Sequence, residues 1–420
     1  MPLNLIPAAS LSPDPPQIPL KSTESAQPRR RRNVSGLVAV ALIAAGAAVA
    51  QSFGRFTYGV LLPAVRDDLG LSNTVAGSLA TANVAAYLVG TIAVAVATST
   101  FRLLAVMRVG FCFSVAGLTL AAIAPGPWLL GMALFLAGFG GACIWIPAPV
   151  IAADAMAPER RSLAIGLMGS GIGAGVVFSG QLSSFVRSTM GDSQWRTVYA
   201  IEAGIGLVVL IATWLLIGHR QDKPTTKGGI GGVSALRRMS GWLPVTMAYT
   251  AFGLMYLLVI GFLTTRLEDD NGWTGSQAAL AFTLLGVAML FGGPTFIAIT
   301  SRIGARSAMA LAFTGWIFGA LAILPGWFVP TLGLSVLLGL LFSGVPSMIT
   351  VVFVENTSTH DYGPAFAAAT LSFGVAQMMS PQLGGFIADA TGSFTAVFML
   401  SAAFAVVGLM AALQLPKRPS

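Results

Sequence analysis

Arg55 is a charged residue deep within a long apolar stretch of the sequence. It lies about 18 residues after Leu37, which is roughly 27 Å along a helix that rises 1.5 Å per residue. Exposing a charged side chain to lipid at that depth costs at least about 3 kcal/mol, so an arginine there is expected to face a polar cavity or a partner. Its guanidinium is a planar fork of donors suited to a carboxylate, and such a pair is strong in a low-dielectric cavity. The sequence therefore predicts that Arg55 binds a carboxylate or a similar anion.

Two structural roles for Arg55 compete with ligand binding. The side chain could extend to the polar edge of the membrane, because Pro63 lies only about 12 Å further along the helix. Alternatively, Arg55 could form an internal ion pair with Glu202, another charged residue inside an apolar stretch. We favour ligand binding, since an ionisable residue within a membrane segment is a functional hypothesis by default.

Four polar residues accompany Arg55 at helical spacing. Gln51, Arg55 and Tyr58 are separated by four and three residues, so they are expected on one face of a helix. Asn83 and Tyr87 are again four residues apart, on the next helix. Both faces are expected to turn toward a water-filled cavity, where these side chains would contact the ligand.

Amide and amphipathic aromatic side chains in other apolar stretches are candidates for the walls of this cavity. They are Trp145, Gln181, Tyr249, Tyr256 and Gln377. Taken singly, each is more often a contact between packed helices than a contact to a ligand.

Glu202 lies about six residues inside the sixth apolar stretch, which is expected to place it near the rim of the membrane. A carboxyl group shielded from water can bind and release a proton near neutral pH, so Glu202 is our candidate for carrying a coupling proton. The competing interpretation is an acid at the membrane interface that bonds to Arg196 or to water.

Several kinds of chemistry find no support in the sequence. It contains no GxxxxGKS/T loop for binding nucleoside triphosphates, so hydrolysis of ATP by this chain is not expected. The two histidines, His219 and His360, fall in predicted loops, which leaves no arrangement for a metal centre in the membrane or for a Ser-His-Asp triad. We therefore expect neither a cofactor nor an enzyme.

The composition shows that membrane helices must position these side chains. Of the 420 residues, 55% are apolar and 9% are charged, whereas soluble domains carry about 25% charged residues. The apolar residues form roughly twelve stretches of about 20 to 28 residues, each near the length that crosses a bilayer. We predict an all-α membrane protein with twelve transmembrane helices, at 36–64, 74–98, 103–123, 127–152, 163–186, 197–217, 244–265, 276–299, 307–324, 329–353, 365–387 and 394–414.

The basic residues fall mostly on one side of these predicted helices. Of the 23 Lys and Arg residues, about eighteen lie on the side of the two termini and about four lie on the other side. This asymmetry predicts a protein of the bacterial cytoplasmic (inner) membrane with both termini in the cytoplasm. Anionic lipid headgroups account for the net charge of +8, so no nucleic-acid partner is expected.

The two halves of the chain resemble each other at an offset of about 200 residues, which indicates a duplicated helical bundle. Ser179–Phe185 matches Ser380–Phe386, with four identities in seven positions. At nearly the same offset, Arg102 corresponds to Arg302 and Asp154 to Glu355. We predict six-helix bundles at 35–218 and 243–414, a cytoplasmic linker at 219–242, and cytoplasmic tails at 1–34 and 415–420, the first of them disordered because it is rich in proline and poor in large apolar residues.

The duplicated six-helix unit and several short motifs resemble the major facilitator superfamily (MFS) over most of the chain. General matches are Pro158–Arg161, Gln194–Arg196 and Gln377–Pro381. The segment GRFTYGVLLP at Gly54–Pro63, followed by DLGLS at Asp68–Ser72, is similar to the YbfB-type branch of that superfamily. The resemblance implies two pseudo-symmetric bundles around a site at the midplane. It also implies an inner gate, in which basic residues latch against acids at the ends of the fourth and tenth helices, at Arg102, Asp154, Arg302 and Glu355.

The resemblance and the position of Arg55 lead to three functional hypotheses. The first is a secondary transporter that moves a small organic anion, such as a carboxylate, by alternating access and in symport with protons. The second is efflux of hydrophobic drugs or metabolites, which the aromatic and Met-rich helices suggest. The third is a membrane sensor that uses the fold without transport. The expected partners are a small-molecule substrate and the lipid bilayer, and the expected oligomeric state is a monomer.

Overall fold

The computed structural model describes residues 35–98, 100–217 and 232–416 of the chain. Throughout these ranges the regular elements are helices. The tail at 1–34, predicted to be disordered, lies outside the described residues, as do 219–231 of the predicted linker and 417–420 of the predicted carboxyl-terminal tail.

The first half of the chain forms six segments of membrane length. They are α1 (Gly36–Ala47) continued by η1 (Ala48–Phe56) and α2 (Thr57–Leu69); α3 (Asn73–Ala97); α4 (Leu103–Ala122); α5 (Pro127–Trp145) followed by α6 (Ala148–Ala155); α7 (Arg161–Met190); and α8 (Trp195–Leu216). Short 3-10 turns, η2 (Pro158–Arg160) and η3 (Asp192–Gln194), precede α7 and α8. The interruption between α5 and α6 falls at Pro147 and Pro149, since proline supplies no backbone N–H to a helix.

The second half begins with a short helix, α9 (Gly232–Arg238), so part of the predicted linker is helical. Its Arg238 forms an ion pair with Asp361, with 2.7 Å between the two side chains. The longer elements are α10 (Trp242–Ile260) followed by α11 (Leu263–Thr265) and η4 (Arg266–Asp270); α12 (Gly275–Ala322); α13 (Phe328–Asn356); α14 (Thr359–Thr391); and α15 (Thr395–Ala412).

Ten helices among the described residues are long and apolar enough to cross a membrane. One of them, α12, has 48 residues and is interrupted at Gly304, whose φ of 79° lies outside the helical region. Glycine adopts such a φ without steric cost, so α12 turns there and supplies two crossing segments. The 33-residue α14 is a further helix of sufficient length. The predicted all-α membrane fold with twelve crossing segments is therefore confirmed.

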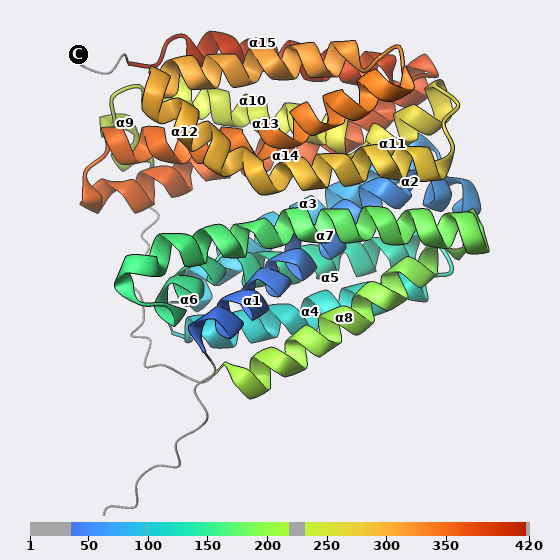
Figure 1. The fold of residues 1–420 in the computed structure, drawn as a ribbon, viewed down its shortest axis with the longest axis horizontal. Coiled ribbons are helices and arrows are strands. Elements are labelled where there is room, and N and C mark those ends of the chain that lie inside the picture. Colours follow the sequence, from blue (N-terminus) through green and yellow to red (C-terminus); the bar gives the residue numbers. More distant parts are fainter. Residues whose placement is uncertain (1–34, 99, 218–231, 417–420) are drawn as a thin grey trace, which may run out of the picture.

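The crossing segments form two bundles that lie side by side, α1–α8 in one and α10–α15 in the other (Figure 1). The main contacts between the bundles are those of α3 with α14 and of α7 with α12. These are the second and fifth segments of one half and the fifth and second segments of the other. Corresponding positions of the two halves therefore meet, as a duplicated unit related by pseudo-symmetry requires.

The bundles approach each other closely where α3 meets α14. A Cβ atom on Gly77 would collide with the carbonyl oxygen of Pro381, and one on Gly385 would collide with that of Asn73. Small residues at such positions let the backbones of membrane helices touch. The boundary between the bundles is thus tightly packed at this end of α3.

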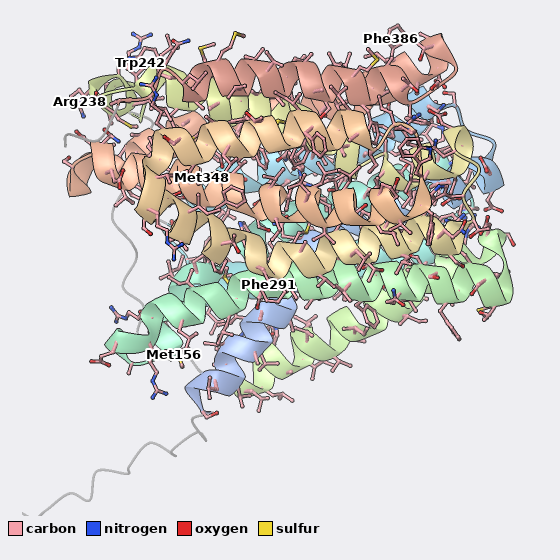
Figure 2. The ribbon with its side chains drawn as sticks, turned by 45° about the horizontal axis from the view of Figure 1, so that its top comes forward. Met156, Arg238, Trp242, Phe291, Met348 and Phe386 are labelled. Carbon is pink, nitrogen blue, oxygen red and sulfur yellow. The ribbon has the colours of Figure 1, made fainter. Side chains whose placement is uncertain are left out.

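The helices run between two faces of the molecule (Figure 2). We call one the terminal face, because Gly36 and Pro416, the ends of the described helical region, lie there; Met156, Arg238 and Trp242 mark it in the figure. We call the opposite end the clasp face, after the contacts that join the bundles there.

The clasp consists of three sets of polar contacts. The Asp389 carboxylate accepts hydrogen bonds from the backbone N–H groups of Asn73 (3.0 Å) and Thr74 (2.7 Å) at the start of α3. In the other two sets an arginine of the first bundle binds an acid of η4: Arg187 to Glu268 at 2.6 and 2.8 Å, and Arg66 to Asp269 at 3.0 Å between Nη2 and Oδ1. In all three sets the donors belong to the first bundle and the carboxylates to the second.

Among the described residues, the hydrogen bonds that join the two bundles lie at Arg55 or on one side of it. Where both partners are described residues, every hydrogen bond between the bundles lies at Arg55 or between Arg55 and the clasp face. The structure is therefore a conformation that is closed at the clasp face.

Candidate functional site

Arg55 lies in a π-helical stretch of the first membrane segment. This stretch, η1, joins the α-helical parts α1 and α2, and such irregular turns inside helices are frequent at functional sites. A π-helical turn persists where other groups bind the carbonyls that it leaves free. Here the Asn83 Nδ2 donates to the Gly54 carbonyl at 2.8 Å and to the Leu134 carbonyl at 2.7 Å. Asn83 thereby fixes the backbone beside Arg55 to α3 and α5.

The Arg55 side chain reaches across the boundary between the two bundles. Its Nη2 donates to the Tyr256 hydroxyl at 2.7 Å, and that hydroxyl donates to the Oε1 of Gln377 at 2.8 Å. The rings of Phe56, Tyr87 and Tyr256 lie 5.6–6.0 Å from the guanidinium carbon, which is within range for cation–π attraction. These neighbours hold the guanidinium in place, but none of them neutralises its charge.

Among the described residues, the Tyr256 hydroxyl is the one acceptor bonded to the Arg55 guanidinium. Arg55 is partly exposed, whereas the side chains of Phe56 and Tyr256 beside it are buried. The Nε of Arg55 is buried and has no hydrogen-bond partner within the described part of the chain. Because a buried donor without an acceptor costs free energy, a carboxylate oxygen brought to this guanidinium would be stabilised.

These contacts differ from both structural roles considered for Arg55. The guanidinium turns to Tyr256 of the second bundle rather than to the membrane edge near Pro63. The carboxyl group of Glu202 is occupied by other residues, described below. The interpretation of Arg55 as a ligand-binding residue stays a prediction.

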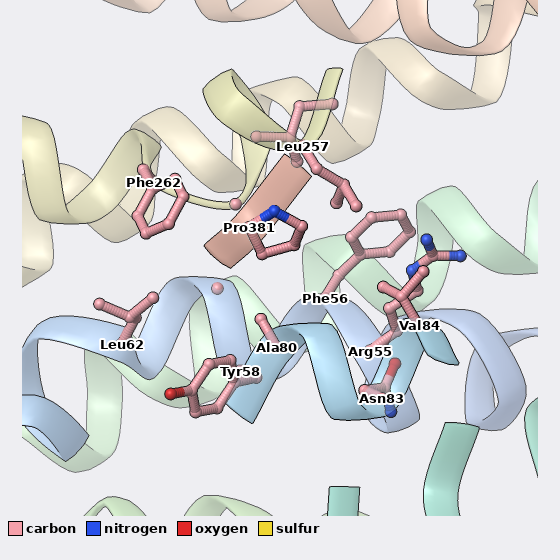
Figure 3. A pocket seen from close by; sticks show the side chains of 13 residues that line it. Arg55, Phe56, Tyr58, Leu62, Ala80, Asn83, Val84, Leu257, Phe262 and Pro381 are labelled. Carbon is pink, nitrogen blue, oxygen red and sulfur yellow. The ribbon is translucent and has the colours of Figure 1, made fainter. Parts of the chain in front are cut away.

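A small cavity lies on the clasp side of Arg55 (Figure 3). It is lined by residues of both bundles, among them Arg55, Asn83, Leu257 and Pro381, and its volume is about 30 Å³. Since a water molecule needs at least about 10–15 Å³, this space holds one or two waters and no organic anion. The space on the clasp side of Arg55 is therefore too small to admit an organic anion in this conformation.

The polar residues predicted on the same helix as Arg55 point in different directions. Gln51 lies beside the Tyr87 hydroxyl. The hydroxyl of Tyr58 instead donates to the backbone carbonyl of Ala76 at 2.9 Å, and Figure 3 shows its ring turned away from the Arg55 guanidinium. The expectation that Gln51, Arg55 and Tyr58 share one face is wrong at Tyr58, because the wider turns of η1 change the angular spacing of side chains.

Three of the candidate wall residues gather in the second bundle. Tyr256 and Gln377 form the hydrogen-bonded pair that meets Arg55. Tyr249 stacks on Phe373, with ring centroids 4.4 Å apart and planes within 14°. The wall of the site on this side is thus aromatic.

The other two candidate wall residues lie apart from Arg55. Gln181 donates to Thr283 of the second bundle at 3.0 Å, on the clasp side. Trp145 packs in a separate apolar cluster with Val40 and Ile43. Val40 and Ile43 precede Arg55 by about 12 to 15 positions, so Trp145 lies roughly 18–22 Å from Arg55 toward the terminal face.

Glu202 is fully buried inside the first bundle rather than near the membrane rim. Its Oε1 lies 2.7 Å from the hydroxyl oxygens of both Thr57 and Ser179. Its Oε2 is buried and makes no hydrogen bond to any described residue. Thr57 follows Arg55 by two residues in the chain, so the carboxyl group lies at nearly the depth of Arg55.

The predicted position of Glu202 was wrong because the packing of α8 overrides its distance from the helix end. Trp195, Val198, Tyr199, Glu202 and Gly206 are the buried positions that recur along one face of α8. This spacing is the ordinary sign of a helix stripe that faces the protein interior. Arg196, considered as a partner, binds Asp68 at 2.8 Å instead.

The residues expected to form an inner gate lie at the terminal face. Asp154 lies 3.8 Å from Arg161. Arg302 and Glu355 line one cavity of about 420 Å³. Arg102 is exposed at the start of α4. Their function as a gate remains a prediction.

The sequence analysis missed the clasp. The available signal was the acidic run from Glu268 to Asp270, on the side of the membrane predicted to carry few basic residues. Charged residues in loops are usually solvated, so this run alone did not indicate contacts between the bundles.

Comparison with known proteins gives the same fold and family. The model of the family described as "Uncharacterised MFS-type transporter YbfB" matches residues 47–413. The uncharacterised MFS-type transporter YtbD of Bacillus subtilis is 24% identical over 377 residues, which cover 86% of this chain and 90% of the relative. Monocarboxylate transporter 13 of Bos taurus is 24% identical over 270 residues, 61% of each protein.

Among solved structures, the chain is similar to a bacterial homologue of the human lysosomal transporter Spinster, crystallised in an inward-facing and unoccupied conformation. The TM-score is 0.69 at 15% sequence identity, over 90% of this chain and 95% of that chain. The shared fold and the match of the family model over nearly all described residues establish what the sequence motifs indicated. The chain belongs to the major facilitator superfamily, in the family described as uncharacterised MFS-type transporter YbfB, and is a multi-pass membrane transporter rather than an enzyme.

Proposed function

We propose that this transporter moves a small organic monocarboxylate in symport with a proton, by alternating access of a site at Arg55. The observation that carries the proposal is the Arg55 guanidinium, which lies at the boundary between the bundles and forms no ion pair with an acid of the described ranges. The name of the bovine relative, a monocarboxylate transporter, supports the same chemistry.

The charge at the site selects an anion with one negative charge. Arg55 is surrounded by the neutral groups of Phe56, Tyr87 and Tyr256. A carboxylate paired with it would leave the site neutral, which is the favoured state in a low-dielectric environment. Arg55 is partly exposed and has five N–H groups, so donors other than the one bonded to Tyr256 can serve that carboxylate.

The position of Arg55 couples binding to the movement of the bundles. Its hydrogen bond to Tyr256 joins the first bundle to the second. Opening of the clasp face requires Arg66 and Arg187 to leave their acids on η4, while the residues at the terminal face close. We propose that Arg102, Asp154, Arg302 and Glu355 form the latch at that closed terminal face.

Glu202 is the proposed carrier of the coupling proton. One carboxyl oxygen accepts from hydroxyl groups and the other has no partner among the residues described, an arrangement that suits a protonated acid better than a buried carboxylate. If Glu202 loses its proton, its carboxylate is attracted to the Arg55 guanidinium and repels the substrate carboxylate. The two sites are close, because Glu202 is bonded to Thr57 and Thr57 follows Arg55 by two residues. Substrate and proton are therefore expected to bind together.

The excess of basic residues on the side of the termini supports a cytoplasmic terminal face in a bacterial inner membrane. With that orientation, the contacts of the clasp close the described conformation at the outer side.

Efflux of hydrophobic cations has weaker support. Such substrates need an acid that faces the transport path, and the one buried acid among the described residues, Glu202, is enclosed by Thr57 and Ser179 within the first bundle. A sensor without transport activity would have no need of a charge held between two bundles.

Uptake by purified protein in liposomes tests the proposal. Truncating one partner of a buried charge pair costs about 2–5 kcal/mol, and the partial exposure of Arg55 places it near the lower end. Arg55→Ala should therefore reduce kcat/KM for a radiolabelled monocarboxylate at least about 30-fold, while Arg55→Lys retains part of the activity because it keeps the charge.

Arg237→Ala is the matched control, since Arg237 is an exposed arginine of α9 outside the bundles. It should leave uptake unchanged. Full activity of a correctly folded Arg55→Ala protein with the same carboxylate would show that the anion binds elsewhere.

A further inference from the structure

Aromatic rings of α10 and α14 lie nearly parallel to one another beside Arg55. Tyr249 and Phe373 are 4.4 Å apart with planes within 14°, and Phe252 and Tyr256 are 5.1 Å apart within 20°. Phe373 also lies parallel to Phe252 and Tyr256, within 12° of each at 6.0 and 6.3 Å. Tyr256 is the residue that binds Arg55.

The same orientation continues toward the terminal face. Phe366 lies 6.3 Å from Tyr249 with planes within 29°, and Tyr362 lies 5.8 Å from Phe366 within 12°. We call the six residues Tyr362, Phe366, Tyr249, Phe373, Phe252 and Tyr256 the aromatic stack. It runs from the start of α14 at the terminal face to the hydroxyl group that meets Arg55.

This common orientation sets the stack apart from the rest of the protein. Across the described ranges, every ring pair with an interplanar angle below 30° belongs to the stack. The other ring pairs, at 32–89°, are tilted or edge-on, as is common in packed cores.

Part of the stack faces the interior of the protein and remains accessible. Phe366 and Phe373 are partly exposed and share a helix face with the buried Gln377. The lipid-facing stripe of α14, which includes the exposed Leu371 and Val375, lies on the opposite side of the helix. The exposed area of Phe366 and Phe373 is therefore directed away from lipid, on the face of α14 that also carries Gln377.

We propose that the transported monocarboxylate carries a flat aromatic ring, which stacks on Phe373 in the plane orientation of the aromatic stack while its carboxylate binds Arg55. This inference rests on the proposed function of Arg55 as the carboxylate site. The partly exposed rings of Phe366 and Phe373 would accept the planar ring, and the guanidinium beyond Tyr256 would orient the acid.

Binding measurements with ligands of equal charge and similar size test this inference. Benzoate and 2-naphthoate are compared by isothermal titration calorimetry with their saturated counterparts, cyclohexanecarboxylate and decahydro-2-naphthoate, and with the neutral benzamide, on purified full-length protein. Stacking on an aromatic face favours the aromatic acids about 3- to 10-fold over the saturated ones. Phe373→Leu should abolish that preference without weakening the binding of cyclohexanecarboxylate.

Phe386→Leu is the control, because Phe386 is an exposed ring on the same helix. It should keep the preference for aromatic acids. Equal binding of benzoate and cyclohexanecarboxylate to the unmodified protein, both weakened in Arg55→Ala, would overturn the aromatic inference and leave the carboxylate site standing. Binding of benzamide as tight as that of benzoate would overturn the proposed carboxylate site itself, and so would failure of all four acids to bind.

Discussion

Replacement of Glu202 by glutamine is predicted to uncouple transport from protons without unfolding the protein. Glutamine has nearly the shape of a protonated glutamate, and its oxygen can still lie 2.7 Å from the hydroxyl groups of Thr57 and Ser179. The second oxygen of Glu202 makes no hydrogen bond to a described residue, so its replacement by an amide NH₂ group breaks none. We expect the free energy of unfolding to change by at most about 1 kcal/mol.

The size of the effect on transport follows from the energy of the proton gradient. A difference of one pH unit is worth about 1.4 kcal/mol per proton, so one proton carried with each anion supports a roughly tenfold accumulation of substrate. A glutamine at position 202 has no proton to release. The ratio of substrate concentration inside to outside should therefore fall from about ten to about one in this variant.

The assay is uptake of a radiolabelled monocarboxylate into liposomes whose interior is more alkaline by about one pH unit, alongside exchange of substrate at equal pH. Liposomes with the Arg55→Ala variant report passive entry of the uncharged acid, which is subtracted. Glu202→Gln should retain exchange and lose accumulation. Tenfold accumulation by Glu202→Gln would refute the assignment of the proton to this residue, and loss of exchange in a folded variant would assign Glu202 to the structure of the site.

Three further substitutions test other parts of the structure. Gly77→Ala places a methyl group against the Pro381 carbonyl, at an overpacking cost of about 1–3 kcal/mol to the conformation closed at the clasp face. The clasp face should open more often, so a cysteine introduced at position 264, behind the clasp, should be labelled at least about fivefold faster. An unchanged rate would show that α3 and α14 separate freely. Asp389→Asn removes the charge from the hydrogen bonds at the start of α3 and should raise the same rate about two- to fivefold, as a loss of about 0.5–1 kcal/mol predicts; slower labelling would contradict the clasp. Tyr256→Phe removes a hydroxyl worth about 1 kcal/mol from the site and should raise KM for the carboxylate about three- to tenfold; an unchanged KM would mean that Tyr256 takes no part in binding.

The fold could be predicted because its causes are local and repeated. Apolar stretches of membrane length can satisfy their backbone groups in lipid only as helices. The matches of Ser179–Phe185 with Ser380–Phe386, and of Arg102 with Arg302, indicated the duplication. The merging of two segments into α12 around Gly304 was not predicted, since it depends on a single backbone angle.

Arg55 could be found from the sequence because a charge in the middle of an apolar stretch is rare. Its partners were predicted only in part. Tyr87, Tyr256 and Gln377 do gather around it, whereas Tyr58 points elsewhere. The difference arises from η1, whose π-helical turns shift side-chain directions that regular α-helical spacing assumes.

The depth of Glu202 and the clasp required the tertiary structure. The sequence places Glu202 by its distance from a helix end, but the tilt and packing of α8 bring it fully inside the bundle. The clasp joins residues more than 80 positions apart, such as Arg187 with Glu268. Nothing in the local sequence pattern distinguishes such charges from solvated loop residues.

An experimental density map of the protein with bound benzoate would test the role of Arg55 most directly. We predict density for a carboxylate within hydrogen-bond distance of the Arg55 guanidinium, between the rings of Tyr87 and Tyr256. A carboxylate bound elsewhere, such as in the cavity beside Arg302, with Arg55 bonded to Tyr256 alone, would contradict the proposed mechanism.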